Sequence, residues 1–446
     1  MILTPADRLI NQITSFFRFP YVKGLLLLIM VLIAMVWANS PYHESYEHIF
    51  HLDFTIGFEG LALTKPVNIW INDGLMAVFF FLVGLEIKKE MIDGQLSTLP
   101  QAFLPVLAAI GGMVIPALIY IGFNYGTEAQ TAWGIPMATD IAFAIGLLSL
   151  VGSAASPKIK VFLTALATAD DLGAILVITI FLTPFIDVES LIAGGIYLGI
   201  MTMANYLGVR NSWFYTIIGI FGLWVALLLS GIHATLAGVL GAFTIPARRK
   251  TTEMEYQEKL TIWVDEFHSS TDSDSMYLLN SHQEQIITKI IVESGRASTP
   301  LQRIIYKIRP FVEFFILPLF ALANAGVRIE GKYLEMVTHP VSLGIIVGLV
   351  VGKLLGITAF SYLGVKLRKS SLSDDTDWNQ IIGAGLFAGI GFTMSLFIAE
   401  LAIKDEATLA IAKVGILTAS VLAAILGLLW FWIMKKKVFI KSAHKQ

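Results

Sequence analysis

The stretch VFLTALATADDLGAILVITIFL (residues 161–182) is apolar and long enough to cross a membrane, yet it carries two adjacent aspartates, Asp170 and Asp171. A helix rises about 1.5 Å per residue, so Asp170 should lie roughly 15 Å from Val161, near the middle of a hydrocarbon core about 30 Å thick. Charge at that depth costs several kcal/mol unless it is paired, hydrated or protonated. The pair therefore predicts a functional site at the membrane midplane.

The whole chain has the composition of a polytopic membrane protein. Of its 446 residues, 56% are hydrophobic and 14% are charged, whereas a typical globular protein carries about 25% charged residues. It contains no cysteine, which excludes disulfides and thiolate metal sites. We expect an all-α fold with about twelve transmembrane helices, at the apolar windows 24–38, 69–87, 103–123, 132–152, 161–185, 190–207, 214–231, 232–246, 310–327, 341–365, 381–403 and 408–434.

Lysine and arginine are concentrated in alternate loops, which predicts the orientation of these spans. Basic loops stay in the cytoplasm, so we expect both termini there. The basic loops carry Arg8, Arg18, Lys23, Lys88, Lys89, Lys158, Lys160, Arg210, Arg248 to Lys250, Lys366, Arg368, Lys369 and Lys435 to Lys437, and the opposite set offers little beyond Lys65, Arg328, Lys332 and Lys404.

Polar segments divide the chain into five parts. Within the insert, SHQEQIITKIIVES predicts a helix, and the preceding Ser-, Asp- and Glu-rich stretch is expected to be loosely ordered. The N-terminal segment has one apolar helical face, which suits either an interfacial helix or an ordinary amphipathic tail. The expected parts are an interfacial amphipathic segment (1–20), spans one to eight (21–246), a cytoplasmic polar insert (247–309), spans nine to twelve (310–434) and a basic cytoplasmic tail (435–446).

Two more charged residues should lie at the depth of the aspartate pair. Lys353 is about twelve residues into its span, and Asp140 follows a Gly-Ile-Pro break in WGIPMATDIAFAIG. Adjacent helical residues point about 100° apart, so Asp170 and Asp171 cannot face one point, and one of them can meet a partner. Lys353 suits charge compensation with or without a transport role. Asp140 suits capping of a broken helix, contact with an ion, or both.

Two spans are expected to be interrupted. The first contains Pro136 and Asp140, and the second, GAGLFAGIGFTMSLF (383–397), has Gly389 and Gly391 at midspan followed by Thr393. Interrupted helices leave backbone groups free, which is tolerated only where those groups line a cavity or meet polar partners. Such spans in corresponding halves of a chain indicate a transporter site between inverted repeats. The corresponding three-helix units would be roughly 103–185 and 341–434.

At these residues the chain resembles the NhaA-type sodium/proton antiporters, which are themselves an example of inverted-repeat transporters with broken helices. The resemblance covers residues 20–245 and 308–432. It is carried by WINDGLMAVFFFLVGLEIKKE, PMATDIAFAIG, ATADDLGAI, SGIHATLAG, ILPLFALANAGV and GIGFTMS.

The resemblance implies a mechanism and a set of residue roles. Asp170 and Asp171 would bind the cation and the protons, Lys353 would pair with Asp170, and Thr139-Asp140 would lie where the broken helices cross. About two protons would be exchanged for one Na⁺ or Li⁺ by alternating access, with no cofactor. The roles in the cytoplasmic funnel and the pH response fall to Asp73, Glu86, Lys89, Glu90 and His233.

The resemblance also implies a location and a partner. The protein would lie in the bacterial inner membrane as a homodimer, with a periplasmic hairpin supplied by residues 45–66, and its partners would be membrane lipid, Na⁺ and H⁺, with no nucleic acid. For His233 the other interpretation is a hydrogen-bonded structural histidine at a periplasmic helix junction.

The chain departs from the family pattern near the funnel, which leaves its pH profile open. Lys89 stands where the family has an arginine. Before the ninth span, Gln302, Ile305 and Tyr306 replace titratable groups, and Arg309 replaces a histidine.

Three other functions fit the sequence less well than exchange. An intramembrane aspartyl protease needs two facing acids and a Gly-x-Gly-Asp motif, which the sequence lacks. A proton-coupled symporter of a small solute would need aromatic or cationic groups around a larger cavity. A regulatory sensor would leave the twelve-span bundle unexplained.

Overall fold

The computed structural model describes residues 20–57, 62–181, 187–270, 279–329, 331, 333–367 and 377–443, with side chains up to residue 436. The interfacial segment expected at 1–20 lies almost wholly outside this range. Helices dominate the described chain, and a single two-stranded sheet accompanies them there. The predicted all-α polytopic membrane fold is confirmed.

Eight described helices are long and apolar enough to cross a membrane without a break. Three of them contain a π-helical turn between two α-helical parts. The eight spans are α2 (Pro20–Ala38), α4 (Val67–Ile69) with η1 (Trp70–Leu75) and α5 (Met76–Asp93), α6 (Leu99–Phe123), α8 (Pro157–Phe181), α9 (Val188–Tyr206), α10 (Ser212–Ile217) with η5 (Ile218–Trp224) and α11 (Val225–Leu229), α18 (Pro340–Val347) with η7 (Gly348–Gly352) and α19 (Lys353–Lys366), and α22 (Glu406–Ala443).

Two further spans are broken, as predicted. The first consists of short 3₁₀ turns η2 (Glu128–Ala132) and η3 (Ile135–Met137) followed by α7 (Ile141–Leu150), with a bend of 42°. The second consists of α20 (Trp378–Ala388) and α21 (Phe392–Ala402), with a bend of 46°. Counting each bent pair once gives ten spans among the described residues.

The two remaining windows also form helices, although these do not have the length or composition of a full span. Window 232–246 contains α12 (Thr235–Thr244), which is only ten residues long because a turn at Gly231 precedes it and Pro246 follows it. Window 310–327 lies on the continuous run α15 (Pro300–Phe311), η6 (Val312–Ile316) and α16 (Leu317–Asn324), whose first part is amphipathic and basic. All twelve predicted windows are therefore helical, and ten of them have the length and apolar composition of a membrane span.

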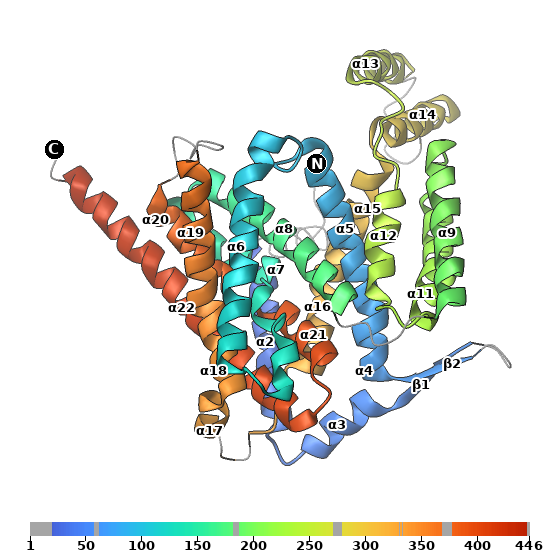
Figure 1. The fold of residues 1–446 in the computed structure, drawn as a ribbon. Coiled ribbons are helices and arrows are strands. Elements are labelled where there is room, and N and C mark those ends of the chain that lie inside the picture. The colour runs from blue at the N-terminus through green and yellow to red at the C-terminus, as the bar shows by residue number, and fades with distance from the viewer. Residues whose placement is uncertain are drawn as a thin grey trace.

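The broken spans are the middle members of two three-helix units (Figure 1). In the first unit, α6 starts at the upper end of the molecule, and α8 follows the broken helix. In the second unit, α18–α19 starts at the lower end, and α22 follows (Figure 1). The two units thus run in opposite directions, as expected for inverted repeats.

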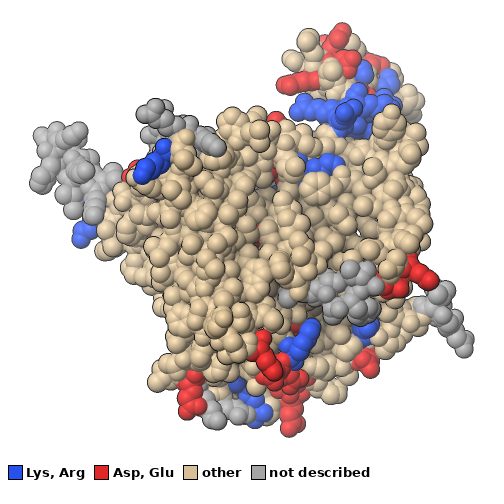
Figure 2. All heavy atoms as spheres, viewed as in Figure 1, with Lys and Arg blue, Asp and Glu red and all other residues tan. Residues whose placement is uncertain are grey.

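Elements outside the spans gather at the two ends of the bundle. Helices α13 (Glu253–Ser269) and α14 (Ser281–Ala297) project from the upper end, where α22 also finishes, and α3 (His43–His51) and α17 (Tyr333–Thr338) lie at the lower end (Figure 1). On the face drawn in Figure 2, charged side chains collect at these ends, and the broad band between them is almost wholly uncharged. That band is the surface expected to face lipid.

The lower end also carries the hairpin that the sequence suggested within 45–66. Strands β1 (Asp53–Ile56) and β2 (Leu63–Pro66) are antiparallel, with Asp53 opposite Pro66 and Ile56 opposite Leu63. The first part of the 45–66 segment is instead helical, as the end of α3.

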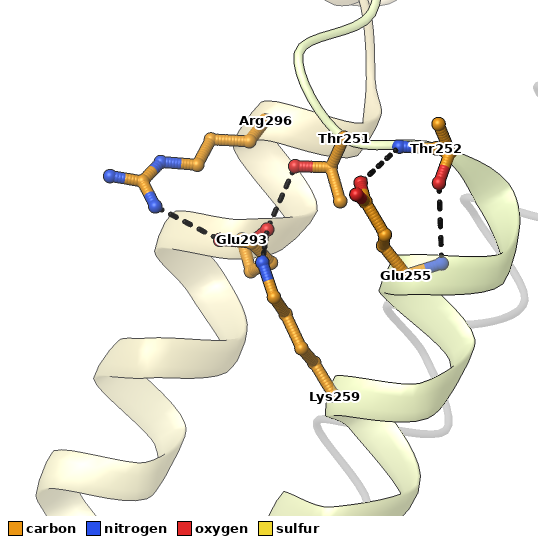
Figure 3. A network of polar contacts seen from close by, with 6 residues as sticks. All are labelled: Thr251, Thr252, Glu255, Lys259, Glu293 and Arg296. Atoms are coloured by element: carbon orange, nitrogen blue, oxygen red, sulfur yellow. Dashed lines mark hydrogen bonds and ion pairs between the residues drawn. The ribbon is translucent and has the colours of Figure 1, made fainter.

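The insert is more ordered than its composition suggested. The predicted helix is present as α14, but the expectation of a loosely ordered beginning is wrong for residues 253–269, which form α13. Thr252 and Glu255 start this helix with reciprocal side-chain-to-backbone bonds (Figure 3). Glu293 of α14 then receives bonds from three side chains, at 2.8 Å from Thr251, 2.7 Å from Lys259 and 3.1 Å from Arg296 (Figure 3).

Contacts with the transmembrane part fix the base of the insert. The Arg210 guanidinium, between α9 and α10, donates to the backbone oxygens of Arg248 at 2.6 Å and Ser298 at 3.1 Å. The Lys250 N–H donates to the Arg296 oxygen at 3.1 Å, which joins the two ends of the helix pair.

Candidate ion-binding site

The aspartate pair is buried at the middle of α8. Asp170 is 1% exposed and Asp171 is 3% exposed. Lys353, which is the first residue of α19 after the π-helical turn η7, is 0% exposed, and its Nζ donates to Asp170 Oδ2 at 2.5 Å. The predicted side chains of the two units therefore meet inside the bundle.

The Lys353 contact leaves much of the carboxylate pair without a partner. Asp170 Oδ1 is buried and accepts no hydrogen bond. Among the described residues, no hydrogen bond reaches the Asp171 carboxylate, which lies within electrostatic range of Asp170, Asp140 and Lys353. Buried carboxylate oxygens without donors need a proton or a cation. The arrangement can therefore hold either of the two.

The broken helices cross beside this pair and satisfy each other's backbone. The Asp140 N–H donates to the Ile390 oxygen at 2.7 Å, and the Thr139 hydroxyl donates to the Ala388 oxygen at 2.8 Å. In the other direction, the hydroxyl and N–H of Thr393 donate to Asp140 Oδ2 at 2.6 and 3.2 Å. Asp140 Oδ1 accepts from the Phe143 N–H at 3.0 Å and so also caps α7.

Glycine permits the close approach at the second break. A Cβ atom on Gly389 would lie 2.5 Å from the Leu349 oxygen, and one on Gly391 would lie 2.1 Å from the Ser395 hydroxyl oxygen. Neither position has room for a side chain. The predicted glycines are therefore explained by packing of α20–α21 against η7 and by the turn itself.

Ser395 follows Thr393 in the second interrupted span, and the sequence marked it only as a polar residue there. Its buried hydroxyl donates to the Ile135 oxygen at 2.9 Å, in the 3₁₀ part of the first broken helix. It is two residues after Thr393, so its position in the motif GIGFTMS was a signal, although nothing local revealed its acceptor.

Four of the five funnel residues fall into two groups along one span, and the fifth, His233, lies outside it. Glu86, Lys89 and Glu90 lie in the last turns of α5, near the end from which the insert projects, while Asp73 lies in η1, roughly 20 Å away along the helix axis. His233 is in the turn between α11 and α12. It lines a small cavity with Phe80 of α5 and Ile175 of α8.

Charged side chains pair near the upper end of α5. Glu86 Oε1 lies 2.6 Å from Arg309 Nη2, and Lys23 Nζ lies 2.6 Å from Glu313 Oε2. The arginine that departs from the family pattern is therefore the partner of Glu86, a pairing that the sequence did not reveal. Glu90 accepts the Gln95 N–H at 2.9 Å, and Lys89 is exposed.

The fold and the site together define a class of protein. It is that of polytopic α-helical membrane proteins in which two broken helices cross beside a buried acid–lysine site, between two units of opposite direction. Inverted-repeat transporters have this organisation.

Comparison with known proteins identifies the family within that class. The profile described as "Na+/H+ antiporter 1" matches residues 14–431. The chain is 44% identical over 423 residues to the Na⁺/H⁺ antiporter NhaA of Oleidesulfovibrio alaskensis, covering 95% of this chain and 94% of that protein. It is 46% identical over 432 residues to NhaA 1 of Shewanella denitrificans, covering 96% and 95%.

A solved structure, that of the sodium proton antiporter MjNhaP1 from Methanocaldococcus jannaschii, aligns with 92% of this chain and 91% of its own. Its sequence identity of 12% and TM-score of 0.44 are too low to add to the argument. The family match and the two relatives decide the matter: the chain belongs to the Na⁺/H⁺ antiporter 1 family.

Proposed function

We propose that the protein is an electrogenic antiporter of the bacterial inner membrane that extrudes Na⁺ or Li⁺ in exchange for about two H⁺. Membership of the family supports the ions, and the geometry supports the site. The observation that carries the proposal is the buried Asp171 carboxylate without a hydrogen bond beside the Lys353–Asp170 pair.

Competition between protons and a cation for the aspartate pair is enough to couple their movements. When the carboxyl groups hold protons, the site has no negative charge to attract a cation. When the protons leave, a dehydrated Na⁺ can take their place, coordinated by carboxylate, hydroxyl and backbone oxygens. Because one occupant excludes the other, alternating exposure of the site to the two sides makes the exchange obligatory.

The proposed stoichiometry lets the membrane potential do work. Two protons moving inward against one Na⁺ moving outward transfer one net charge. That charge gains about 2.3 kcal/mol per 100 mV, enough to sustain a Na⁺ gradient of about fifty-fold.

Alternating access would change the relation between the two three-helix units around the crossing. At the crossing itself the units are linked by single hydrogen bonds at Thr139, Asp140, Thr393 and Ser395, which can be exchanged without unfolding either unit. The Lys353–Asp170 pair and the packing of α19 on α6 also join the units. In the orientation that the basic loops favour, the insert and both termini face the cytoplasm. The strand hairpin would then face the periplasm, where it could join two copies as a homodimer.

The test is Na⁺-induced proton movement in everted membrane vesicles between pH 6.5 and 9. We expect Na⁺ or Li⁺ to collapse the pH gradient with the wild type and not with Asp171→Asn, while Asp53→Asn, an exposed carboxylate on β1, stays active. Full exchange by a folded Asp171→Asn protein would refute the site assignment. Absence of a Na⁺ response in the folded wild type would refute sodium exchange and favour the proton-coupled symporter.

A further inference from the structure

The start of α21 holds the most unusual backbone conformation of the described chain. Phe392, the first residue of this helix, has a φ of 27°, the only positive value at a described residue other than glycine. This region is unfavourable for an L-residue, so it persists only where the surroundings impose it. Something other than local preference must therefore hold this end of the broken helix.

A hydroxyl from a third helix meets Phe392. The Phe392 N–H donates to Ser420 Oγ of α22 at 3.1 Å, and Ser420 is only 4% exposed. The first N–H groups of a helix have no acceptor within that helix. Ser420 thus supplies the helix cap that a neighbouring Ser or Asp in the chain usually provides.

The following residue connects this cap to the ion-binding site. The N–H and hydroxyl of Thr393 donate to Asp140 Oδ2. The Phe392 ring packs at 5.2 Å between centroids against Phe143, in the helix that Asp140 caps. The N–H groups of Phe392 and Thr393 therefore donate to two different elements, α22 and the first broken helix. The position of Ser420 determines the direction from which Thr393 reaches Asp140.

Helix α22 also holds the far end of α21. Lys413 Nζ lies 2.5 Å from Glu400 Oε1, and both side chains are mostly buried. Lys413 and Ser420 are seven residues apart, which places them on one face of α22. Beside Ser420 on this face, the Ala423 methyl group would lie 3.3 Å from a Cβ atom on Gly389. Helices α21 and α22 are thus joined at both ends.

We infer that Ser420 is a positioning residue for the cation site. By receiving the Phe392 N–H it fixes the start of α21, and through Thr393 it fixes Asp140, so it sets the affinity for Na⁺ without touching the ion. This inference rests on the proposed function, because it concerns the same site.

The test compares Ser420→Ala with the matched control Thr418→Val in everted vesicles. Thr418 also carries a hydroxyl on α22, but this hydroxyl donates to the Val414 oxygen of its own helix at 2.7 Å and meets the exposed Tyr333 hydroxyl of α17 at 3.0 Å, not α21. Removing the acceptor of a buried N–H should raise the half-saturating Na⁺ concentration by about tenfold in Ser420→Ala, with the maximal rate within about twofold. The control should match the wild type.

A second measurement, the Na⁺-dependent thermal shift of the purified protein, reads the same affinity without transport. Unchanged Na⁺ affinity in folded Ser420→Ala would overturn the inference, even if its thermal stability fell. Should Ser420→Ala not fold, Ser420→Cys, with a weaker acceptor, should show a smaller rise, and wild-type affinity there would also overturn it. Lack of exchange by a wild type that still shows the Na⁺-dependent shift would refute the proposed function instead, and that shift would then decide the role of Ser420.

Discussion

Lys353 Nζ lies 2.5 Å from Asp170 Oδ2, and neither side chain is more than 1% exposed. The two adjacent aspartates therefore differ in their hydrogen-bond partners. Asp170 is joined to a fixed cation contributed by the second three-helix unit, whereas Asp171 has no hydrogen bond within the described residues. In the function proposed above, an arriving proton or Na⁺ would be bound by Asp171 alone, or by both acids if Lys353 releases Asp170.

Replacing Lys353 by alanine should cost stability first. It leaves the Asp170 carboxylate buried without a counter-charge, and breaking a buried ion pair in this way typically costs about 3–5 kcal/mol. We expect a clearly lower unfolding temperature in detergent, with little change in the preference between Na⁺ and Li⁺. Lys366→Ala, which removes an exposed lysine from the end of the same helix, should unfold like the wild type. Equal stability of Lys353→Ala and the wild type would count against the ion pair.

Gly389→Ala should disrupt the second break. The new Cβ atom would lie 2.5 Å from the Leu349 oxygen and 3.1 Å from the Leu386 oxygen, which are backbone atoms that cannot move independently. Overpacking of this kind costs about 1–3 kcal/mol, and the displaced break should abolish most exchange. The control is Gly195→Ala in α9, where a Cβ atom meets nothing within 4 Å. That change should be neutral or stabilise the helix by up to ~1 kcal/mol. Equal activity of both variants would contradict the close-packed break.

Asp140 and Thr393 should be energetically coupled. The Thr393 hydroxyl donates to Asp140 Oδ2 at 2.6 Å, and bonds to a charged group contribute about 1.5–3 kcal/mol. In a double-mutant cycle of Asp140→Asn and Thr393→Val, we expect a coupling of that size in unfolding free energy, together with a weaker apparent Na⁺ affinity in each single variant. Additive effects would show that the two broken helices do not depend on this bond.

The breaks and the depth of the charged residues could be predicted because they leave local signals. Pro136, Gly389 and Gly391 mark positions where a helix cannot continue or where another backbone comes close. The rise of a helix places Asp170 and Lys353 at one depth. The start of helix α13 could also have been predicted, since Thr252 and Glu255 have the spacing of a capping box. The polar composition of the segment instead suggested loose order.

The partners of distant side chains could not be predicted in the same way. Glu86 meets Arg309 and Phe392 meets Ser420 only because helices far apart in sequence pack together. A polar residue in an apolar helix indicates that it has a partner, but the crossing angles of the helices decide which one. The funnel residues illustrate this, because the family resemblance gave Asp73 and Glu86 one role, whereas they lie near opposite ends of the span formed by α4, η1 and α5.

Acidification should loosen the insert through Glu293. Hydrogen bonds from Lys259, Thr251 and Arg296 lower the pKa of this carboxyl from its ordinary value of 4.5 to about 2. A group whose pKa is lower in the folded state stabilises the fold above its unfolded pKa and loses that effect as the pH falls toward the folded pKa. The helix pair α13–α14 should therefore be fully held at pH 7 and should loosen between about pH 5 and pH 2.

Hydrogen exchange of the α13–α14 amides, corrected for intrinsic rates, should show the beginning of this loss of protection on moving from pH 7 to pH 4, while α6 stays protected. Glu293→Gln should reduce protection already at pH 7 and remove most of the pH dependence, because the amide cannot ionise. Glu284→Gln, an exposed position on the same helix, should behave like the wild type. The same protection in Glu293→Gln as in the wild type at both pH values would mean that packing and the Arg210 contacts, rather than the Glu293 network, hold the insert together.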